Sequence, residues 1–92
     1  MNTAISEIDF IESFNIYPTV SSDFVNVEIE FARVTTPEVY LFSTHGQLVQ
    51  KINLNTSRLI NERIDVTDLS PGVYLLSVKA EGKIKTTRIV KM

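Results

Sequence analysis

Asp68-Leu69-Ser70-Pro71-Gly72-Val73-Tyr74-Leu75-Leu76-Ser77-Val78 is the stretch from which the architecture of this chain is most readily inferred. Its Pro-Gly pair predicts a turn, because proline presets φ near −65° and glycine accepts positive φ. The apolar run Val73–Val78 that follows is short and bounded by turn residues, which predicts a strand rather than a helix. Leu69 and Tyr74 flank the turn and can enter one core. This spacing predicts a tyrosine corner, with a buried ring whose hydroxyl bonds to backbone near the turn.

Six further segments carry strand signals between turn residues: Phe14–Tyr17, Phe24–Phe31, Glu38–Ser43, Leu48–Leu54, Leu59–Val66 and Lys83–Lys91. The second alternates most clearly, with aliphatic residues on one face and glutamates on the other, as in an antiparallel strand with one wet side. Glu81-Gly82 predicts a tight hairpin before the last strand. Seven short strands, regular turn signals and no helical pattern predict an all-β fold, a seven-stranded antiparallel immunoglobulin-like β-sandwich.

The inward faces of these strands give the expected core. Leu48, Ile52 and Leu54 are expected to share one side of their strand. Tyr40 and Phe42 form a second apolar face on their strand, which predicts a central position with both rings beneath the second sheet. The expected core consists of Tyr17, Val25, Val27, Ile29, Val39, Leu41, Leu48, Ile64, Val66, Leu69, Tyr74, Leu76, Val78 and Ile89.

The length of 92 residues is that of one domain. The absence of cysteine excludes a disulfide framework, thiol catalysis and a cysteine-built zinc site. No apolar run approaches the length of a transmembrane helix. Met1 is followed by a polar, acidic stretch rather than by a basic start and an apolar segment, so no signal peptide is expected. We expect residues 1–13 to be a linker and residues 14–92 to be the folded domain.

The charge is unevenly placed along the chain. Residues 1–40 hold seven acidic residues and one arginine, a net charge of −6, whereas residues 41–92 hold four acidic and eight basic residues, a net charge of +4. Solvated charges spread over a folded surface would account for this. The sharper alternative is a basic docking patch on the last hairpin, formed by Lys83, Lys85, Arg88 and Lys91. A total charge of −2 argues against a nucleic-acid partner.

Residues capable of chemistry are few. His45 is the only histidine and is expected in a turn. Because no second histidine or cysteine is present to complete a site, we expect His45 to be neither a metal ligand nor a general base. Asp65 and Asp68 straddle a strand end and need not face each other. Ser21-Ser22-Asp23 offers oxygen atoms but lacks the ligand spacing of a calcium loop, and Asp23 is expected to form an Asx turn. Phosphate loops and nucleophile elbows are absent. We expect no catalytic residues, no metal and no cofactor.

Several motifs in order carry a family resemblance. They are Tyr17-Pro18, Ser22-Asp23 before a Val25/Val27/Ile29 strand, a hairpin at Gly46, Leu69-Ser70-Pro71-Gly72-Val73-Tyr74, and terminal Arg88-Ile89-Val90-Lys91. Over about residues 14–92 the chain resembles the C-terminal sorting domain of the type IX (Por) secretion system. The resemblance marks Tyr17, Pro18, Asp23, Gly46, Leu69, Pro71, Gly72, Tyr74, Arg88, Ile89, Val90 and Lys91 as sorting-motif residues. The family usually has Tyr-Pro-Asn-Pro and Asn-Gly where this chain has Tyr17-Pro18-Thr19-Val20 and His45-Gly46, both in turns.

The resemblance implies a non-catalytic signal at the end of a cargo protein of a Gram-negative bacterium. The cargo crosses the inner membrane, folds in the periplasm and is recognised by the outer-membrane translocon. A sortase-like surface peptidase usually cuts the domain off in the linker and attaches the cargo to the cell surface. We expect Ile89 to anchor the last strand while its edge and basic side chains contact the translocon. An exposed edge also allows weak self-association. Two alternatives remain, a fibronectin-like adhesive or spacer module and a carbohydrate-binding module.

Overall fold

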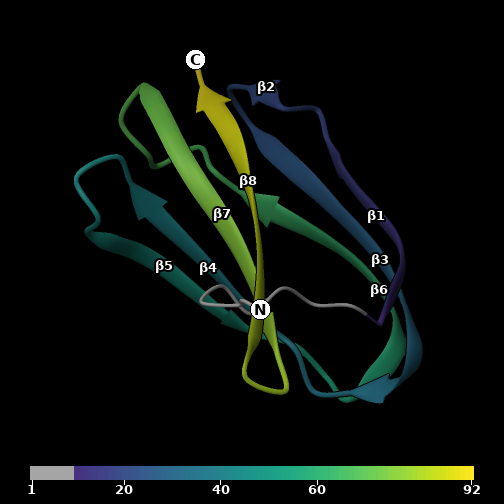
Figure 1. Cartoon of the computed structure of the whole chain (residues 1–92). Coiled ribbons are helices and arrows are strands. Elements are labelled where there is room, and N and C mark those ends of the chain that lie inside the picture. Colours follow the sequence, from purple (N-terminus) through teal and green to yellow (C-terminus); the bar gives the residue numbers. More distant parts are fainter. Residues whose placement is uncertain (1–9) are drawn as a thin grey trace.

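The computed structural model describes residues 10–92, which form strands and turns without a helix (Figure 1). No segment within this range is a helix that could cross a membrane. The strands are β1 (Ile11–Tyr17), β2 (Val20–Ser21), β3 (Phe24–Thr35), β4 (Glu38–Ser43), β5 (Leu48–Asn53), β6 (Ser57–Asp65), β7 (Gly72–Ala80) and β8 (Lys83–Lys91). The seven expected strands are all present, and the two-residue β2 is an addition.

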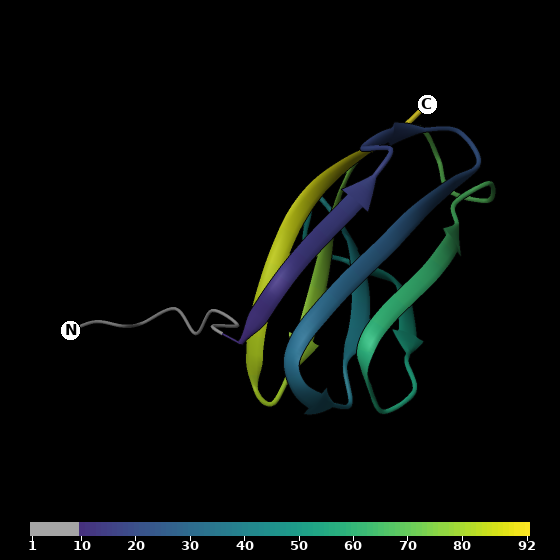
Figure 2. The ribbon, with the colours of Figure 1, turned by 90° about the vertical axis from the view of Figure 1, so that its right-hand side faces the viewer.

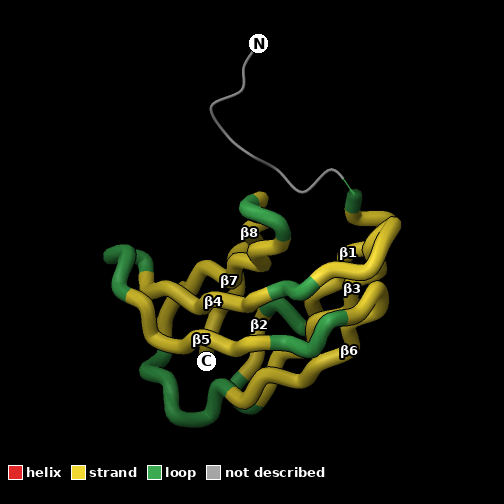
Figure 3. Tube along the Cα trace, turned by 90° about the horizontal axis from the view of Figure 1, so that it is seen from below, coloured by secondary structure: helices red, strands yellow, loops and turns green. Residues whose placement is uncertain are grey.

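The strands form two sheets that pack as a sandwich. One sheet has the order β1-β3-β6 and the other the order β2-β8-β7-β4-β5. All pairs are antiparallel except β2 with β8, which is parallel. Figure 2 shows β1 and β8 at the same margin of the sandwich, one from each sheet, and Figure 3 shows β7, β4 and β5 on the other side of the core from β1, β3 and β6. The all-β sandwich expected from the sequence is confirmed.

The core lies between the inward faces of the two sheets. Alternation along β3 places every second residue there, and Val27 and Phe31 are completely buried. Burying apolar side chains from both sheets supplies the main driving force for folding of so small a domain. The buried apolar residues are Phe10, Val25, Val27, Ile29, Phe31, Val39, Leu41, Leu54, Ile60, Ile64, Val66, Tyr74, Leu76, Val78, Ala80 and Ile89.

The first strand begins earlier than the sequence pattern indicated. β1 starts at Ile11 rather than at Phe14. Phe10 is buried just before it, its ring centroid lies 5.7 Å from that of Phe31, and its carbonyl accepts a hydrogen bond from the Ala32 amide at 2.7 Å. A register shift between Ile11 and Ser13 in the pairing with β3 breaks the period-2 pattern at this point, so alternation in the sequence did not reveal the start of the strand.

Two residues expected in the core are exposed. Tyr17 is 44% exposed because it lies on the outer face of β1, opposite Asn26, and its hydroxyl donates to Glu28. Leu48 is 47% exposed. A register shift in β5 pairs Leu48 with Phe42, so Leu48 changes to the outer face while Ile52 stays on the inner face. A one-residue bulge reverses the facing of every residue beyond it, and sequence alternation alone does not reveal it.

The rings of Tyr40 and Phe42 do not lie beneath the second sheet. β4 is central, between β5 and β7, as its two apolar faces predicted. However, Val39 and Leu41 occupy the inner face and are buried, so Tyr40 and Phe42 project from the outer face and are half-buried. The expectation that these two rings lie beneath the second sheet was wrong, because apolar side chains on both faces of a strand do not show that both faces are covered.

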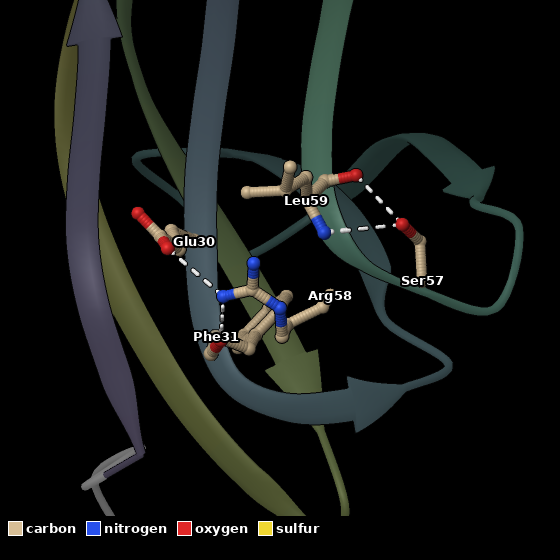
Figure 4. A network of polar contacts seen from close by, with 5 residues as sticks. All are labelled: Glu30, Phe31, Ser57, Arg58 and Leu59. Atoms are coloured by element: carbon tan, nitrogen blue, oxygen red, sulfur yellow. Dashed lines mark hydrogen bonds and ion pairs between the residues drawn. The ribbon is translucent and has the colours of Figure 1, made fainter.

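Arg58 stabilises an irregular part of the pairing between β3 and β6. The register shifts between Glu30 and Thr35. There the Arg58 guanidinium donates to a Glu30 carboxylate oxygen at 2.9 Å and to the Phe31 carbonyl at 3.3 Å (Figure 4). Ser57 Oγ donates to the Leu59 carbonyl at 2.8 Å and accepts from the Leu59 amide at 3.1 Å. These side chains supply hydrogen bonds where the regular ladder is interrupted.

Candidate functional site

Most of the sorting-motif residues gather at one end of the sandwich, where β1, β4 and β8 finish and β3 and β7 begin. We call this end the motif end; it lies at the top of Figure 1. The register places Ser43 opposite Tyr74, Gly72 opposite Lys91, and Val20 opposite Val90. Residues separated by some 70 positions in the sequence are therefore neighbours, and the motif residues come together only when the domain is folded.

The tyrosine corner is confirmed. Tyr74 is 7% exposed, and its hydroxyl donates to the carbonyl of Ser70 at 2.6 Å. Leu69 packs against the core, and its amide donates to the carbonyl of Val66 at 3.1 Å. The corner ties the connection between β6 and β7 to the core and places the start of β7 beside the chain end.

Two turns at the motif end depend on glycine. Gly72 has a φ of +151° and Gly46 one of +83°, a region that side-chain-bearing residues rarely adopt. The Gly46 amide donates to the carbonyl of Ser43 at 3.0 Å, and the Ser43 amide donates to the carbonyl of Gln47 at 2.9 Å. Gly46 thus completes the hairpin between β4 and β5, as the sequence predicted, and the exposed His45 lies in that hairpin.

β2 fastens the chain end to the rest of the domain. The Val90 amide donates to the carbonyl of Thr19 at 2.7 Å, and the Met92 amide donates to that of Ser21 at 3.0 Å. Pro18 follows β1 through a cis peptide bond and leads into this segment. Residues 19–22 carry no strand signal in the sequence, since a two-residue strand is too short for a periodic pattern.

The turn before β3 is formed by Ser21 rather than by Asp23. Ser21 Oγ accepts hydrogen bonds from the amides of Asp23 and Phe24, each at 3.2 Å. Asp23 contributes its main-chain carbonyl, which accepts from the Val66 amide at 2.9 Å. The expected Asx turn at Asp23 is therefore wrong. A Ser/Thr turn takes its place, in which the serine oxygen accepts the main-chain hydrogen bonds.

Asp65 lies at the end of β6, and its carboxylate accepts hydrogen bonds from Thr67 in the loop that follows. One carboxylate oxygen accepts from Thr67 Oγ at 2.6 Å and from the Thr67 amide at 2.8 Å. These hydrogen bonds, aided by the positive charge of Lys91, lower the pKa of Asp65. Lys91 itself is 9% exposed. This end of β6 therefore holds a structural carboxylate.

The four basic residues of the last strand do not form a single patch. Arg88 projects from the outer face of the sheet and is exposed. Lys85 lies at the sandwich margin with its ammonium 5.1 Å from the centroid of the Phe14 ring, whereas Lys83 is far from the motif end, beside the hairpin at Gly82. Ile89 is buried in the core. β2 covers the β8 edge only at Val90 and Lys91 among the residues that the structure describes.

The described part of the chain holds no group of three or more histidine, cysteine, aspartate or glutamate residues that could bind a metal ion. Its motif residues serve turns, strand ends and a shared core. Such an arrangement defines a small β-sandwich module.

Residues 15–92 match the family described as the secretion system C-terminal sorting domain, and the chain belongs to this family. No curated protein matches the chain. The chain is therefore a C-terminal sorting signal for type IX secretion. This function implies fusion to a cargo protein, interaction with the secretion machinery, and export to the cell surface or the medium. Domains of this kind are generally non-catalytic.

Proposed function

We propose that the outer-membrane translocon of the type IX system recognises this domain in its folded state, at the motif end and along the exposed part of β8. The observation that carries the proposal is the pairing of the chain end with Thr19–Ser21 and Gly72. Because this pairing joins distant parts of the sequence, a receptor that contacts the chain end meets a composite folded surface.

Within this surface the motif residues have two kinds of role. Tyr74 and Ile89 are buried and shape the end from within, and Gly72 supplies its turn. Arg88 is exposed and is the basic residue best placed to touch a receptor. Lys91 is largely buried, so its contribution is to the fold, where its charge favours the Asp65 carboxylate.

The proposal includes the route of the cargo. The cargo passes through the periplasm with its sorting domain folded, and a sortase-like peptidase at the surface then cuts the linker. Phe10 belongs to the core, so we place the cut before Phe10 rather than anywhere in residues 1–13. Removing Phe10 would open a cavity against Phe31 and weaken the domain.

A secretion assay tests the proposal. A signal peptide and a fluorescent protein are fused in front of residues 1–92, and the fusion is expressed in a bacterium with a working type IX system and in its translocon mutant. Fluorescence at the surface or in the medium only in the first strain is the expected result. Retention in the periplasm of both strains would refute the proposal. The same fusion without residues 88–92 should remain periplasmic, and normal secretion of a folded fusion lacking them would refute a role for the chain end.

A further inference from the structure

The outer face of the five-stranded sheet carries an exposed apolar surface that the fold does not need. We call it the aromatic face. The strand registers bring its side chains into adjacent rows, with Phe42 between Leu75 and Leu48, and Tyr40 beside Ser77. Leu48, Leu75 and Ile84 are all exposed on it. Contiguous exposed apolar side chains on a small soluble domain mark an interaction site more often than single ones do.

The two rings of the aromatic face are arranged in a regular way. The centroids of Tyr40 and Phe42 are 6.0 Å apart and their planes differ by 9°. Together with Ser77, Lys79 and Ile84 they line a shallow hollow. The floor is held by a hydrogen bond between the hydroxyls of Ser77 and Thr86, 2.8 Å apart. Aromatic side chains ordered on a rigid sheet lose little conformational entropy on binding, which makes them effective contact residues.

The aromatic face is also locally basic. Glu38, an acidic residue on it, accepts a hydrogen bond from the Tyr40 hydroxyl at 2.9 Å and lies 3.6 Å from the Lys51 ammonium. Lys79 and Arg88 point outward from β7 and β8, and no ion pair within residues 10–92 engages either of them. The outer face of the other sheet differs, since Glu28 and Glu30 lie at its centre. Among residues 10–92, the outer face of the five-stranded sheet is therefore the more basic of the two outer faces, although the whole chain has a net charge of −2.

We propose that the aromatic face docks onto a protein surface of the secretion machinery that presents apolar side chains bordered by acidic residues. Charge complementarity selects this partner, because Lys79, Arg88 and Lys51 would face carboxylates while Tyr40 and Phe42 fill the centre. The inference rests on the proposed function and names the surface through which it acts. Arg88 lies both on this face and next to the motif end, so the two surfaces are continuous.

The secretion fusion described above tests this surface with a double variant, Tyr40→Thr with Phe42→Thr. Threonine keeps strand propensity and these side chains lie outside the core, so the domain should stay folded. We expect the secreted fraction to fall roughly tenfold. Leu59→Thr is the matched control, because Leu59 is an exposed apolar residue on the opposite outer face, at the other end of the sandwich from the motif end. Its secretion should be unchanged.

Charge reversal tests the basic border separately. Lys79→Glu with Arg88→Glu should reduce secretion as strongly as loss of the rings, whereas Arg63→Glu on the opposite face should not. Circular dichroism and thermal unfolding of each purified variant verify that it is folded. If the unaltered fusion is secreted and both double variants are secreted equally well, the aromatic face is not the docking surface although the sorting function stands. If the unaltered fusion is not secreted, the proposed function itself fails.

The identity of the occupant is tested by a photo-crosslinking amino acid placed at Leu48 or, as the control, at Leu59. Both leucines are exposed, and they lie on opposite outer faces. An adduct with an outer-membrane component of the machinery from position 48 alone is the expected result. An adduct between two copies of the fusion would make this face a self-association surface, and equal adducts from both positions would show contact without specificity. Either of these results would overturn the inference.

Discussion

Tyr74 is the residue whose two ends have different energetic roles. Its ring fills the core between the sheets, and its hydroxyl satisfies the Ser70 carbonyl in the turn that precedes β7. The ring contributes through burial and packing, whereas the hydroxyl contributes one hydrogen bond. Substitutions can separate these two contributions.

We expect Tyr74→Phe to lower the free energy of unfolding by about 1–2 kcal/mol, because it leaves the Ser70 carbonyl without its donor. Tyr74→Ala should cost about 3–5 kcal/mol through the cavity it creates. Tyr17→Phe is the control, since the Tyr17 hydroxyl is bonded at the surface and its loss should cost less than about 0.5 kcal/mol. Urea denaturation measures all three. A cost below about 1 kcal/mol for Tyr74→Ala would contradict the packing of its ring in the core.

Gly72 tests the backbone at the same corner. A methyl group at Gly72 would meet no atom within 4 Å, so a cost of Gly72→Ala would come from the φ of +151° alone. We expect that strain to exceed about 1 kcal/mol. Chemical denaturation gives the value, and an unchanged midpoint would mean that the backbone relaxes at this turn.

At the level of strands, the irregular pairings are where sequence reasoning succeeded least. Alternation over residues 25–31 of β3 and along β7 located the core correctly because the inward residues there follow period 2. The bulges beside Leu41 and Ile11 are not encoded in that period, so the exposure of Leu48 and the start of β1 were not foreseeable. The two-residue β2 is defined only by its partner, β8.

Arg58 stabilises the irregular pairing of β3 with β6, and Arg58→Met measures by how much. This variant keeps the aliphatic stem but removes the donors to Glu30 and to the Phe31 carbonyl. We expect a loss of about 1 kcal/mol, mainly from the main-chain carbonyl, because exposed ion pairs contribute little. Lys51→Met removes an ion pair with Glu38 that has no main-chain component and should cost less than about 0.5 kcal/mol. Equal losses in the two variants would contradict a special role for Arg58.

Asp65, at the end of β6, should make the free energy of unfolding depend on pH. Hydrogen bonds from Thr67 lower the pKa of Asp65 in the folded state, so the folded domain binds this proton less readily than the unfolded chain. The stabilisation by Asp65 is complete above its unfolded pKa, near 4, and is lost as the pH falls through the lower folded pKa. The difference in stability between the native protein and Asp65→Asn should therefore be largest at neutral pH and shrink below about pH 4. A difference that is constant with pH, measured by urea denaturation, would contradict this assignment.

For the whole molecule, the motif residues were recognisable from sequence but their assembly was not. Leu69, Gly72 and Tyr74 could be assigned their roles because turn chemistry is local. The pairing of Val90 with Thr19 and the outward position of Tyr40 and Phe42 depend on how distant strands meet. These long-range pairings bring the motif residues together at one end of the folded domain, which supports our proposal that the secretion machinery recognises the folded domain.

The secretion of a fusion that keeps every motif residue but cannot fold tests that claim most directly. Val27→Asp places a carboxylate at a completely buried position of β3 without changing any motif residue, and should unfold the domain. Secreted and periplasmic amounts of this fusion are compared with those of the unaltered fusion and of Val27→Ile, which preserves the core. We expect Val27→Asp to remain periplasmic and Val27→Ile to be secreted. Secretion of unfolded Val27→Asp at the unaltered level would show that the machinery recognises a linear sequence and would contradict recognition of the folded domain.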